Sequence, residues 1–261
     1  MSTFHESQRR APAEVWELFR EHTELRAVID AALEGRVGSI RHASESRLTA
    51  AELRVGCYSI FGGDAGSDQA EHLVRSAGGP AELVYTGEPW RRRIIEFHGA
   101  HAVPDPMQGF DPSGLDTVAL SGRADQIPEG FEVRRLTCAD AAALGPELSP
   151  NGMDVYESPE ALIEHGVGRV AVTDDGQLAC VASSYAAALE HIEVAIATAE
   201  RWRGRGLATA VAARLAHDCL ERGVTPEWNA SNPVSQRLAL RLGYRTRGTV
   251  TILRLRDRTA P

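Results

Sequence analysis

The amino-acid sequence predicts an α+β fold arranged in two domains. The chain of 261 residues is longer than one typical domain, and its hydrophobic content of 43% is enough for sizeable cores. Segments with strand-like alternation and segments with a helical period follow one another in both halves. Between the halves, Pro104–Gly114 and Ser121–Gly130 are rich in Pro, Gly and Asp and indicate a linker. We therefore expect domains at residues 1–126 and 127–261.

The first half begins with a predicted amphipathic helix at Ala13–Leu33. Its apolar residues recur near a period of 3.6, and Gly35 follows as a stop. The later elements are identified by alternation, by turn residues, or by a proline near the first position of a helix. They are strands at Val37–His42, Leu53–Phe61 and Ala81–Tyr85, helices at Ser67–Ser76 and Pro89–Phe97, and a strand that starts at His101.

The second half alternates in the same way. Phe131–Leu136 has a strand pattern, and Thr137–Asp140 has the residues of a helix start before Ala141–Leu144. A helix at Leu207–Glu221 carries one apolar stripe, and Gly223 follows it as a stop. The stripe is Leu207, Val211, Leu215 and Cys219. The other predicted elements are helices at Ser158–His165 and Pro233–Leu242, and strands at Arg169–Thr173, Gln177–Tyr185, Glu190–Thr198, Thr225–Ala230 and Val250–Leu255.

A short Arg/Gly turn between a strand and a helix is the most informative motif. Its sequence, Arg203-Gly-Arg-Gly-Leu-Ala208, fits R-x-x-G-x-A. Such a turn presents consecutive backbone N–H groups at a helix N-terminus, where the helix dipole adds partial positive charge. Gly204 and Gly206 let the backbone approach a ligand without a Cβ in the way. The motif therefore predicts a pyrophosphate site.

Strand, turn and helix together resemble the acetyl-CoA motif of the GNAT superfamily of N-acetyltransferases. The stretch Trp228–Tyr244 resembles the second GNAT motif, with N-x-x-S-x-x-L and a closing Gly-aromatic pair. Tyr156–Glu160, Val181–Tyr185 and Leu207–Leu220 resemble the narrower family that includes the zwittermicin A resistance acetyltransferase. The resemblance covers about residues 127–257. It implies a GNAT fold there: a mixed, largely antiparallel sheet flanked by helices and splayed between Glu190–Thr198 and Thr225–Ala230.

The resemblance also implies a set of coenzyme-binding residues. Main-chain groups of the last strand residues would hold the pantetheine arm and thioester, and the turn would cradle the pyrophosphate. Asn232 begins a helix, so it is either an N-cap, a contact to the coenzyme arm, or both. Arg203 and Arg205 are either phosphate contacts or solvated surface charges. The full set is Ile196, Ala197, Thr198, Arg203, Gly204, Arg205, Gly206, Leu207, Ala208, Thr209, Asn232 and Ser235.

Glu193 is the candidate general base. Strand alternation puts Glu193 on one face with small alanines, which leaves room for a substrate, and partial burial would raise its pKa. The alternative is an ordinary solvated or salt-bridged strand residue. Two family positions differ: Ala195 stands where an acidic residue is usual, and Ala239 stands where many GNAT enzymes have a tyrosine acid. Three candidates for the acceptor pocket, each of which could instead be structural, are His191, Tyr185 and Trp228.

The first half repeats the GNAT order of elements, which indicates either a degenerate GNAT-like copy or a generic accessory domain. Its counterpart to the phosphate turn, Gly62–Ser67, contains Asp64 and no arginine. A carboxylate repels a pyrophosphate, so we expect no coenzyme site in this half.

The charge and the cysteines of the chain narrow the classes of function that it can have. A formal net charge of -8 disfavours nucleic-acid binding and favours cationic partners such as amines. No apolar run approaches the length of a membrane span, no metal-ligand spacing occurs, and four isolated cysteines indicate a reducing, cytoplasmic setting. We expect an acetyl-CoA-dependent N-acetyltransferase, as a monomer or homodimer, acting on a small-molecule primary amine such as an antibiotic. The alternatives are a protein or peptide amino-group acetyltransferase and a non-catalytic acyl-CoA-binding sensor.

Overall fold

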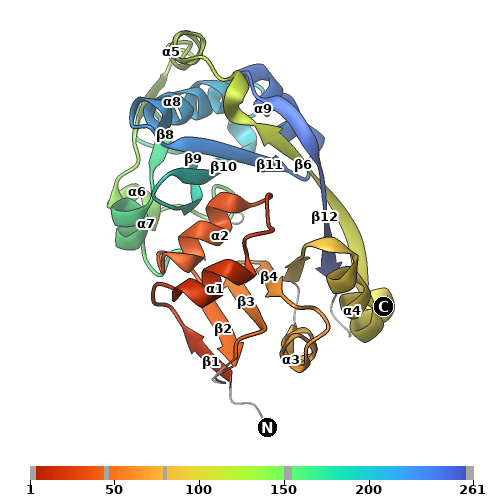
Figure 1. Ribbon diagram of the computed structural model, residues 1–261. Helices are drawn as coiled ribbons and strands as arrows, with labels where there is room; N and C mark the ends of the chain where they lie inside the picture. Colours follow the sequence, from red (N-terminus) through yellow and green to blue (C-terminus); the bar gives the residue numbers. More distant parts are fainter. Residues whose placement is uncertain (1–3, 44–46, 79–80, 150–154, 257–261) are drawn as a thin grey trace. The chain divides into compact units, whose positions relative to one another are not determined.

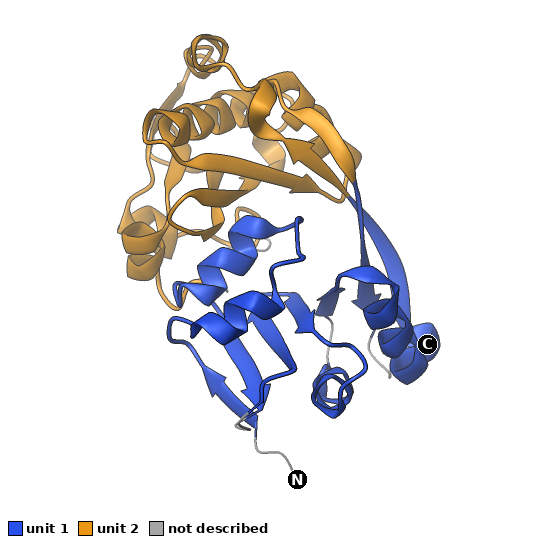
Figure 2. Cartoon of the chain, viewed as in Figure 1, with its two compact units in different colours: residues 1–107, 249–261 blue, residues 108–248 orange. Residues whose placement is uncertain are grey.

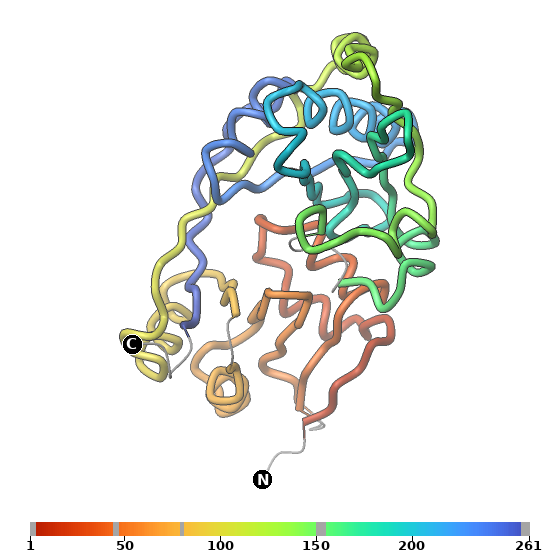
Figure 3. Tube along the Cα trace, turned by 180° about the vertical axis from the view of Figure 1, so that it is seen from behind, coloured from red at the N-terminus to blue at the C-terminus, as the bar shows by residue number. Residues whose placement is uncertain are grey.

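The computed structural model describes residues 4–43, 47–78, 81–149 and 155–256 (Figure 1). The chain forms two compact units, residues 1–107 with 249–261 and residues 108–248 (Figure 2). This division differs from the boundary at residue 126 that the sequence predicts. The chain passes from one unit to the other within two strands, β6 (Ala102–Asp111) and β12 (Arg245–Leu255). Both strands can be followed by colour along the trace in Figure 3.

Unit 1 contains one mixed sheet with the strand order β1-β2-β3-β4-β5-β12. The β4 and β5 strands are parallel, and the other neighbouring pairs are antiparallel. Its elements, besides parts of β6 and β12, are β1 (Phe4–Ser7), α1 (Ala13–Leu18), α2 (Arg26–Leu33), β2 (Ser39–Ala43), β3 (Ala50–Val55), β4 (Tyr58–Gly63), α3 (Asp68–Ser76), β5 (Ala81–Val84), α4 (Gly87–His98) and the 3₁₀ turn η1 (Gly99–His101).

Unit 2 has the same arrangement, with the strand order β7-β8-β9-β10-β11-β6. Here β10 and β11 are the parallel pair, and the other pairs are antiparallel. Its elements, besides parts of β6 and β12, are η2 (Pro112–Gly114), α5 (Thr117–Ala124), β7 (Phe131–Arg135), α6 (Cys138–Ala142), α7 (Pro159–His165), β8 (Gly168–Thr173), β9 (Leu178–Ala187), β10 (His191–Thr198), η4 (Glu200–Trp202), α8 (Leu207–Glu221), β11 (Thr225–Ala230) and α9 (Pro233–Leu242).

The two halves of the chain run through the same order of elements. Apart from α5, which precedes β7, and the 3₁₀ turns, each has a strand, two helices, three strands, a helix, a strand, a helix and a last strand. The last strands are exchanged: β6 pairs with β11 in unit 2 through residues 108–110, and β12 pairs with β5 in unit 1 through residues 253–255. The mixed, largely antiparallel sheet that the sequence predicts for the second half is thus confirmed, but the strand that pairs with β11, β6, comes from the first half.

Three predicted segments are wrong in detail. The expected helix at Ala13–Leu33 is two helices: α1 ends at Leu18, and Leu25, with a left-handed φ of 53°, precedes α2. The expected single strand Leu53–Phe61 is the β3–β4 hairpin, which turns at Gly56 with φ 54°. The segments expected as linker form β6 and α5, and they contribute Phe110, Leu120 and Ala124 to the hydrophobic core of unit 2.

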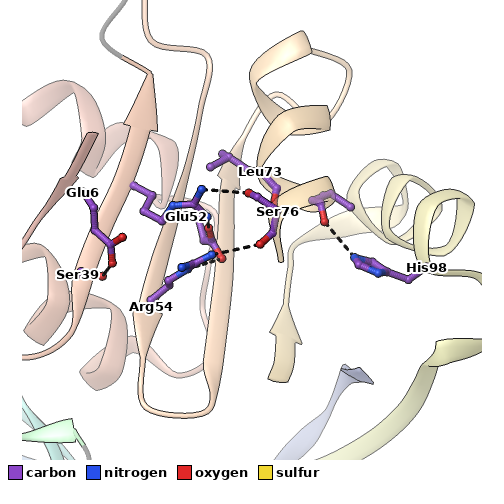
Figure 4. Close-up of polar contacts among 9 residues, drawn as sticks. Glu6, Ser39, Glu52, Arg54, Leu73, Ser76 and His98 are labelled. Carbon is purple, nitrogen blue, oxygen red and sulfur yellow. Dashed lines mark hydrogen bonds and ion pairs between the residues drawn. The ribbon is translucent and has the colours of Figure 1, made fainter. Parts of the chain in front are cut away.

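One cluster of polar contacts in unit 1 forms around a buried carboxylate, Glu52 (Figure 4). Glu52 on β3 is fully buried, and its two oxygens accept from Arg41 Nη1 at 2.5 Å and Arg54 Nε at 3.1 Å. Both guanidinium groups also reach Ser76, Arg41 at the side-chain Oγ and Arg54 at the backbone carbonyl. These contacts fasten the end of α3 to β2 and β3, so the cluster has a structural role.

Candidate active site

One pocket of about 840 Å³ brings together every residue predicted to bind coenzyme. It opens between the end of β10, the turn before α8, and the start of α9. All twelve predicted residues, from Ile196 to Ser235, line it. The sequence reading missed other lining residues, which are Pro146, Glu147, Trp202, Val234, Arg237, Leu238 and Arg241.

The turn into α8 leaves backbone donors available at the pocket. Gly204 and Gly206 have φ values of 77° and 89°, in the left-handed region that favours glycine, and an added Cβ at either would meet no atom within 4 Å. Gly206 is the N-cap of α8 and has no side chain to accept from the first N–H groups of the helix. No acidic residue stands in the first turn of α8. An anionic ligand would find backbone donors there. The pocket is also lined by one acidic residue, Glu147, whose Oε1 accepts from the backbone N–H of Glu200.

The equivalent turn in unit 1 is closed by its own side chains. Ser67 caps α3 by accepting from Ala70 N at 3.2 Å, and Asp64 accepts from Gly66 N at 2.8 Å. Asp68 and Glu71 add negative charge to the first turn of α3. The two halves therefore differ at the turn that the sequence predicts to bind pyrophosphate.

The two arginines of the turn, Arg203 and Arg205, each make one contact within the protein. Arg203 donates from Nε to the carbonyl of Thr198 at 3.1 Å, which ties the turn to the end of β10. The Arg205 guanidinium lies 4.9 Å from the centre of the Trp202 ring, a cation–π distance. Both side chains are exposed and keep further N–H donors for a ligand.

The start of α9 combines a cap with a hydroxyl. Asn232 accepts from Ser235 N at 2.9 Å, so it is an N-cap, and it lines the pocket as well. The Ser235 hydroxyl accepts from Trp228 Nε1 at 3.0 Å, which leaves its own hydrogen free to donate toward the pocket. Trp228 itself is 1% exposed and belongs to the hydrophobic core, so it reaches the pocket through Ser235.

Glu193 lies where β10 and β11 part. The two strands pair in parallel from His191 and Thr225 to Glu193 and Glu227, and beyond that β11 pairs only with β6. The backbone N–H of Asn229 therefore has no β10 carbonyl, and Glu193 Oε1 accepts from it at 3.0 Å. Glu193 Oε2 accepts from Asn229 Nδ2 at 2.9 Å. This carboxyl group is neither solvated nor ion-paired, and it stands on the strand that leads to the pocket.

The environment of Glu193 keeps its carboxyl group protonated more readily than usual. Its side chain is 6% exposed, and burial raises its pKa to about 8, with a further rise from the neighbouring carboxylate of Glu227. The hydrogen bonds from Asn229 lower the pKa but do not offset the burial. Glu227, on the neighbouring strand, is thus a second carboxylate beside Glu193. The parallel register of the two strands was needed to find it.

His191 and Tyr185, the two other candidates for lining the acceptor-amine pocket, lie near Glu193 and Glu227. His191 Nδ1 is 3.8 Å from Glu227 Oε1, and Tyr185 is buried at the irregularity in β9 opposite Glu193 and Val194. None of Glu193, His191 and Tyr185 is among the residues that line the 840 Å³ pocket. Ala239, at the position of the usual tyrosine acid, is fully buried.

Within the described residues, no group of three or more His, Cys, Asp or Glu side chains is placed to hold a metal ion. All four cysteines lie in described segments, and none of them forms a disulfide bond. No described helix has the length and apolar character needed to span a bilayer.

Comparison with known proteins identifies relatives of both units. The family model described as GNAT acetyltransferase matches residues 17–253, most of the chain. A GCN5-related N-acetyltransferase-like protein from Streptococcus suis has a similar crystal structure, with a TM-score of 0.79 and 28% identity, covering 93% of this chain and 97% of that one.

Two further relatives share part of the sequence or only the fold. The uncharacterized N-acetyltransferase YdfB of Bacillus subtilis is 29% identical over 132 residues, and the match spans about half the length of each protein. A tandem GNAT protein from the clavulanic acid biosynthesis pathway shares the fold at 12% identity and a TM-score of 0.59, with 97% of this chain and 98% of that one covered.

Proposed function

Since the chain belongs to the GNAT acetyltransferase family, a family of acyltransferases, we propose that it transfers acetyl from acetyl-CoA to a primary amine of a small molecule. One observation carries the proposal: all twelve predicted coenzyme residues line one pocket. Helix α8 begins at this pocket, and no side chain caps its N-terminus. The turn at residues 203–208 would receive the pyrophosphate. Backbone groups of residues 196–198 would hold the pantetheine arm and the thioester.

In the proposed reaction, the amine nitrogen attacks the thioester carbonyl carbon. The new C–N bond forms, the C–S bond breaks, and the thiolate leaves. The proton released from nitrogen passes to Glu193, directly or through one water. A carboxyl group with a pKa of about 8 is matched to this task near neutral pH, since proton transfer is most efficient when the pKa of the base lies near the working pH. Ser235 would donate toward the coenzyme, and His191 and Tyr185 would border the acceptor.

The acceptor class follows from charge and from the family resemblance. The net charge of -8 favours a cationic amine, and the resemblance to the zwittermicin A resistance acetyltransferase suggests an aminopolyol or peptide-like antibiotic. We place the reaction in the cytoplasm, with unit 1 as a degenerate GNAT-like copy that holds no coenzyme.

The test is release of free thiol from acetyl-CoA by the full chain across a library of amines, antibiotics and peptides. We expect turnover with at least one amine and calorimetric binding of acetyl-CoA without it. Binding with no turnover on any amine would support a sensor, which the buried Ala239 at the usual acid position also favours. Absence of binding would overturn the proposal.

A further inference from the structure

A second, smaller pocket adjoins the candidate coenzyme pocket. It has a volume of about 380 Å³ and lies between α5, the start of α8 and the C-terminal end of α9. Six residues line it: Ala119, Gly122, Arg123, Gln126, Thr209 and Arg241. Thr209 and Arg241 line both pockets, so one ligand can extend from the first into the second.

The lining of this small pocket is suited to a phosphate monoester. It offers two guanidinium groups, a hydroxyl and an amide, and no carboxylate is among its six residues. Arg123 uses one N–H toward the carbonyl of Ala119, at 3.0 Å, and keeps its other donors. Arg241 Nη1 donates to Thr209 Oγ1 at 3.4 Å, which leaves the Thr209 hydrogen free to donate. The nearby carboxylate of Asp125 is neutralised by Arg214 at 2.7 Å.

The chemistry of the coenzyme indicates which phosphate belongs there. Thr209 directly follows the turn assigned to the pyrophosphate, and in coenzyme A a single ribose separates the 5′-pyrophosphate from the 3′-phosphate. We propose that Arg123 and Arg241 bind the 3′-phosphate of coenzyme A and make the protein selective for the phosphorylated coenzyme. This inference rests on the proposed function and assigns a ligand contact to α5, a helix from the segment that the sequence reading treats as linker.

The test compares the affinity of the full chain for acetyl-CoA and for acetyl-3′-dephospho-CoA by calorimetry. We expect the wild-type protein to prefer acetyl-CoA by about tenfold or more, the effect of one charge-assisted hydrogen bond. Arg123→Glu should bring the preference close to unity by weakening acetyl-CoA alone, and Arg241→Ala should reduce the preference too. Arg222→Glu makes the same change in charge at the far end of α8 and should keep the preference.

The outcomes separate this inference from the proposed function. Equal wild-type affinity for the two ligands, or a preference that survives in both Arg123→Glu and Arg241→Ala, would overturn the 3′-phosphate site and leave acetyl-CoA binding intact. Failure to bind either ligand would overturn the proposed function itself. Thermal unfolding of each variant shows whether it is folded, and Arg241→Ala decides the question if Arg123→Glu is not.

Discussion

At the scale of single residues, the proton acceptor is the most testable assignment. Glu193→Gln keeps the shape of the side chain but cannot take a proton. We expect the rate of acetyl transfer to fall by about 10²–10⁴-fold, with acetyl-CoA affinity nearly unchanged. The wild-type rate should rise with pH through about 8, as Glu193 ionises, and the variant should lack this limb. A pH–rate profile shared by both proteins would assign the proton to His191 or to solvent.

The same substitution has a defined sign in stability. Because folding raises the pKa of Glu193, its contribution to the free energy of unfolding is fully present below about pH 4.5 and is lost as pH rises through about 8. The stability of the wild-type protein relative to Glu193→Gln should therefore decline over that range. Denaturant unfolding at several pH values measures this difference.

The neighbouring carboxylate should tune the base. Glu227→Gln removes a like charge beside Glu193, so the pKa of Glu193 should fall and the limb of the pH–rate profile should move to lower pH. Burial is the larger cause of the raised pKa, so the limb should stay above the ordinary value of 4.5. Glu190→Gln, an exposed carboxylate just before β10, is the matched control and should leave the profile in place. An unchanged profile in Glu227→Gln would refute the coupling.

The phosphate turn can be tested with a pair of glycines. Gly206 and Gly223 stand at the two ends of α8 with φ values of 89° and 71°, and neither has an atom within 4 Å of an added Cβ. Tryptophan should cost about 1–2 kcal/mol of backbone strain at either position. Only Gly206→Trp should also weaken acetyl-CoA binding, by roughly 100-fold or more, because Gly206 lines the pocket and Gly223 does not. Equal affinities in calorimetry would show that the ligand does not approach this turn.

At the scale of elements, α5 is the helix whose role changed most between sequence and structure. Leu120 is fully buried in the core of unit 2, whereas Val118 on the same helix is 80% exposed. We expect Leu120→Ala to lower the free energy of unfolding by about 2–5 kcal/mol and Val118→Ala to change it by less than about 0.5 kcal/mol. Chemical denaturation measures both. Equal, small effects would mean that the segment behaves as a linker after all.

At the scale of the whole molecule, the duplicated order of elements makes the number of coenzyme sites a sharp question. The first turn of α3 is capped by Ser67 and carries acidic residues, whereas the first turn of α8 is open. Titration of the full chain should therefore saturate at one acetyl-CoA per chain. Two equivalent sites in calorimetry would contradict this expectation.

The exchanged strands also decide which fragments can be studied. A segment of residues 127–261 would lack Phe110, Leu120 and Ala124 from the core of unit 2, and its Leu253 and Leu255 belong to the core of unit 1. Each half supplies a strand that pairs with a strand of the other half, so experiments should use the full chain.

The sequence by itself determined the elements around the phosphate turn. The bounds of α8, β11 and α9 agree with the predicted ranges, because an apolar stripe, an N-cap asparagine followed by proline, and closing glycines are local patterns. The same local chemistry, glycines that permit a positive φ at the start of a helix, pointed to the pocket. The twelve residues that the GNAT resemblance named lie at the end of β10, in the turn and first residues of α8, and at the start of α9, all within residues 196–235.

Tertiary structure alone decided the features that depend on which strands lie side by side. Glu227 became the partner of Glu193 through the parallel register of β10 and β11, and no spacing within either strand encodes that pairing. Proline and glycine made β6 and α5 look like linker, yet pairing with β11 and packing on α8 outweighed those local preferences. β6 pairs with β11 of the second half, and β12 pairs with β5 of the first half, although each half contains a similar set of strands. Local patterns predict that a strand forms, and long-range pairing determines the sheet that it joins.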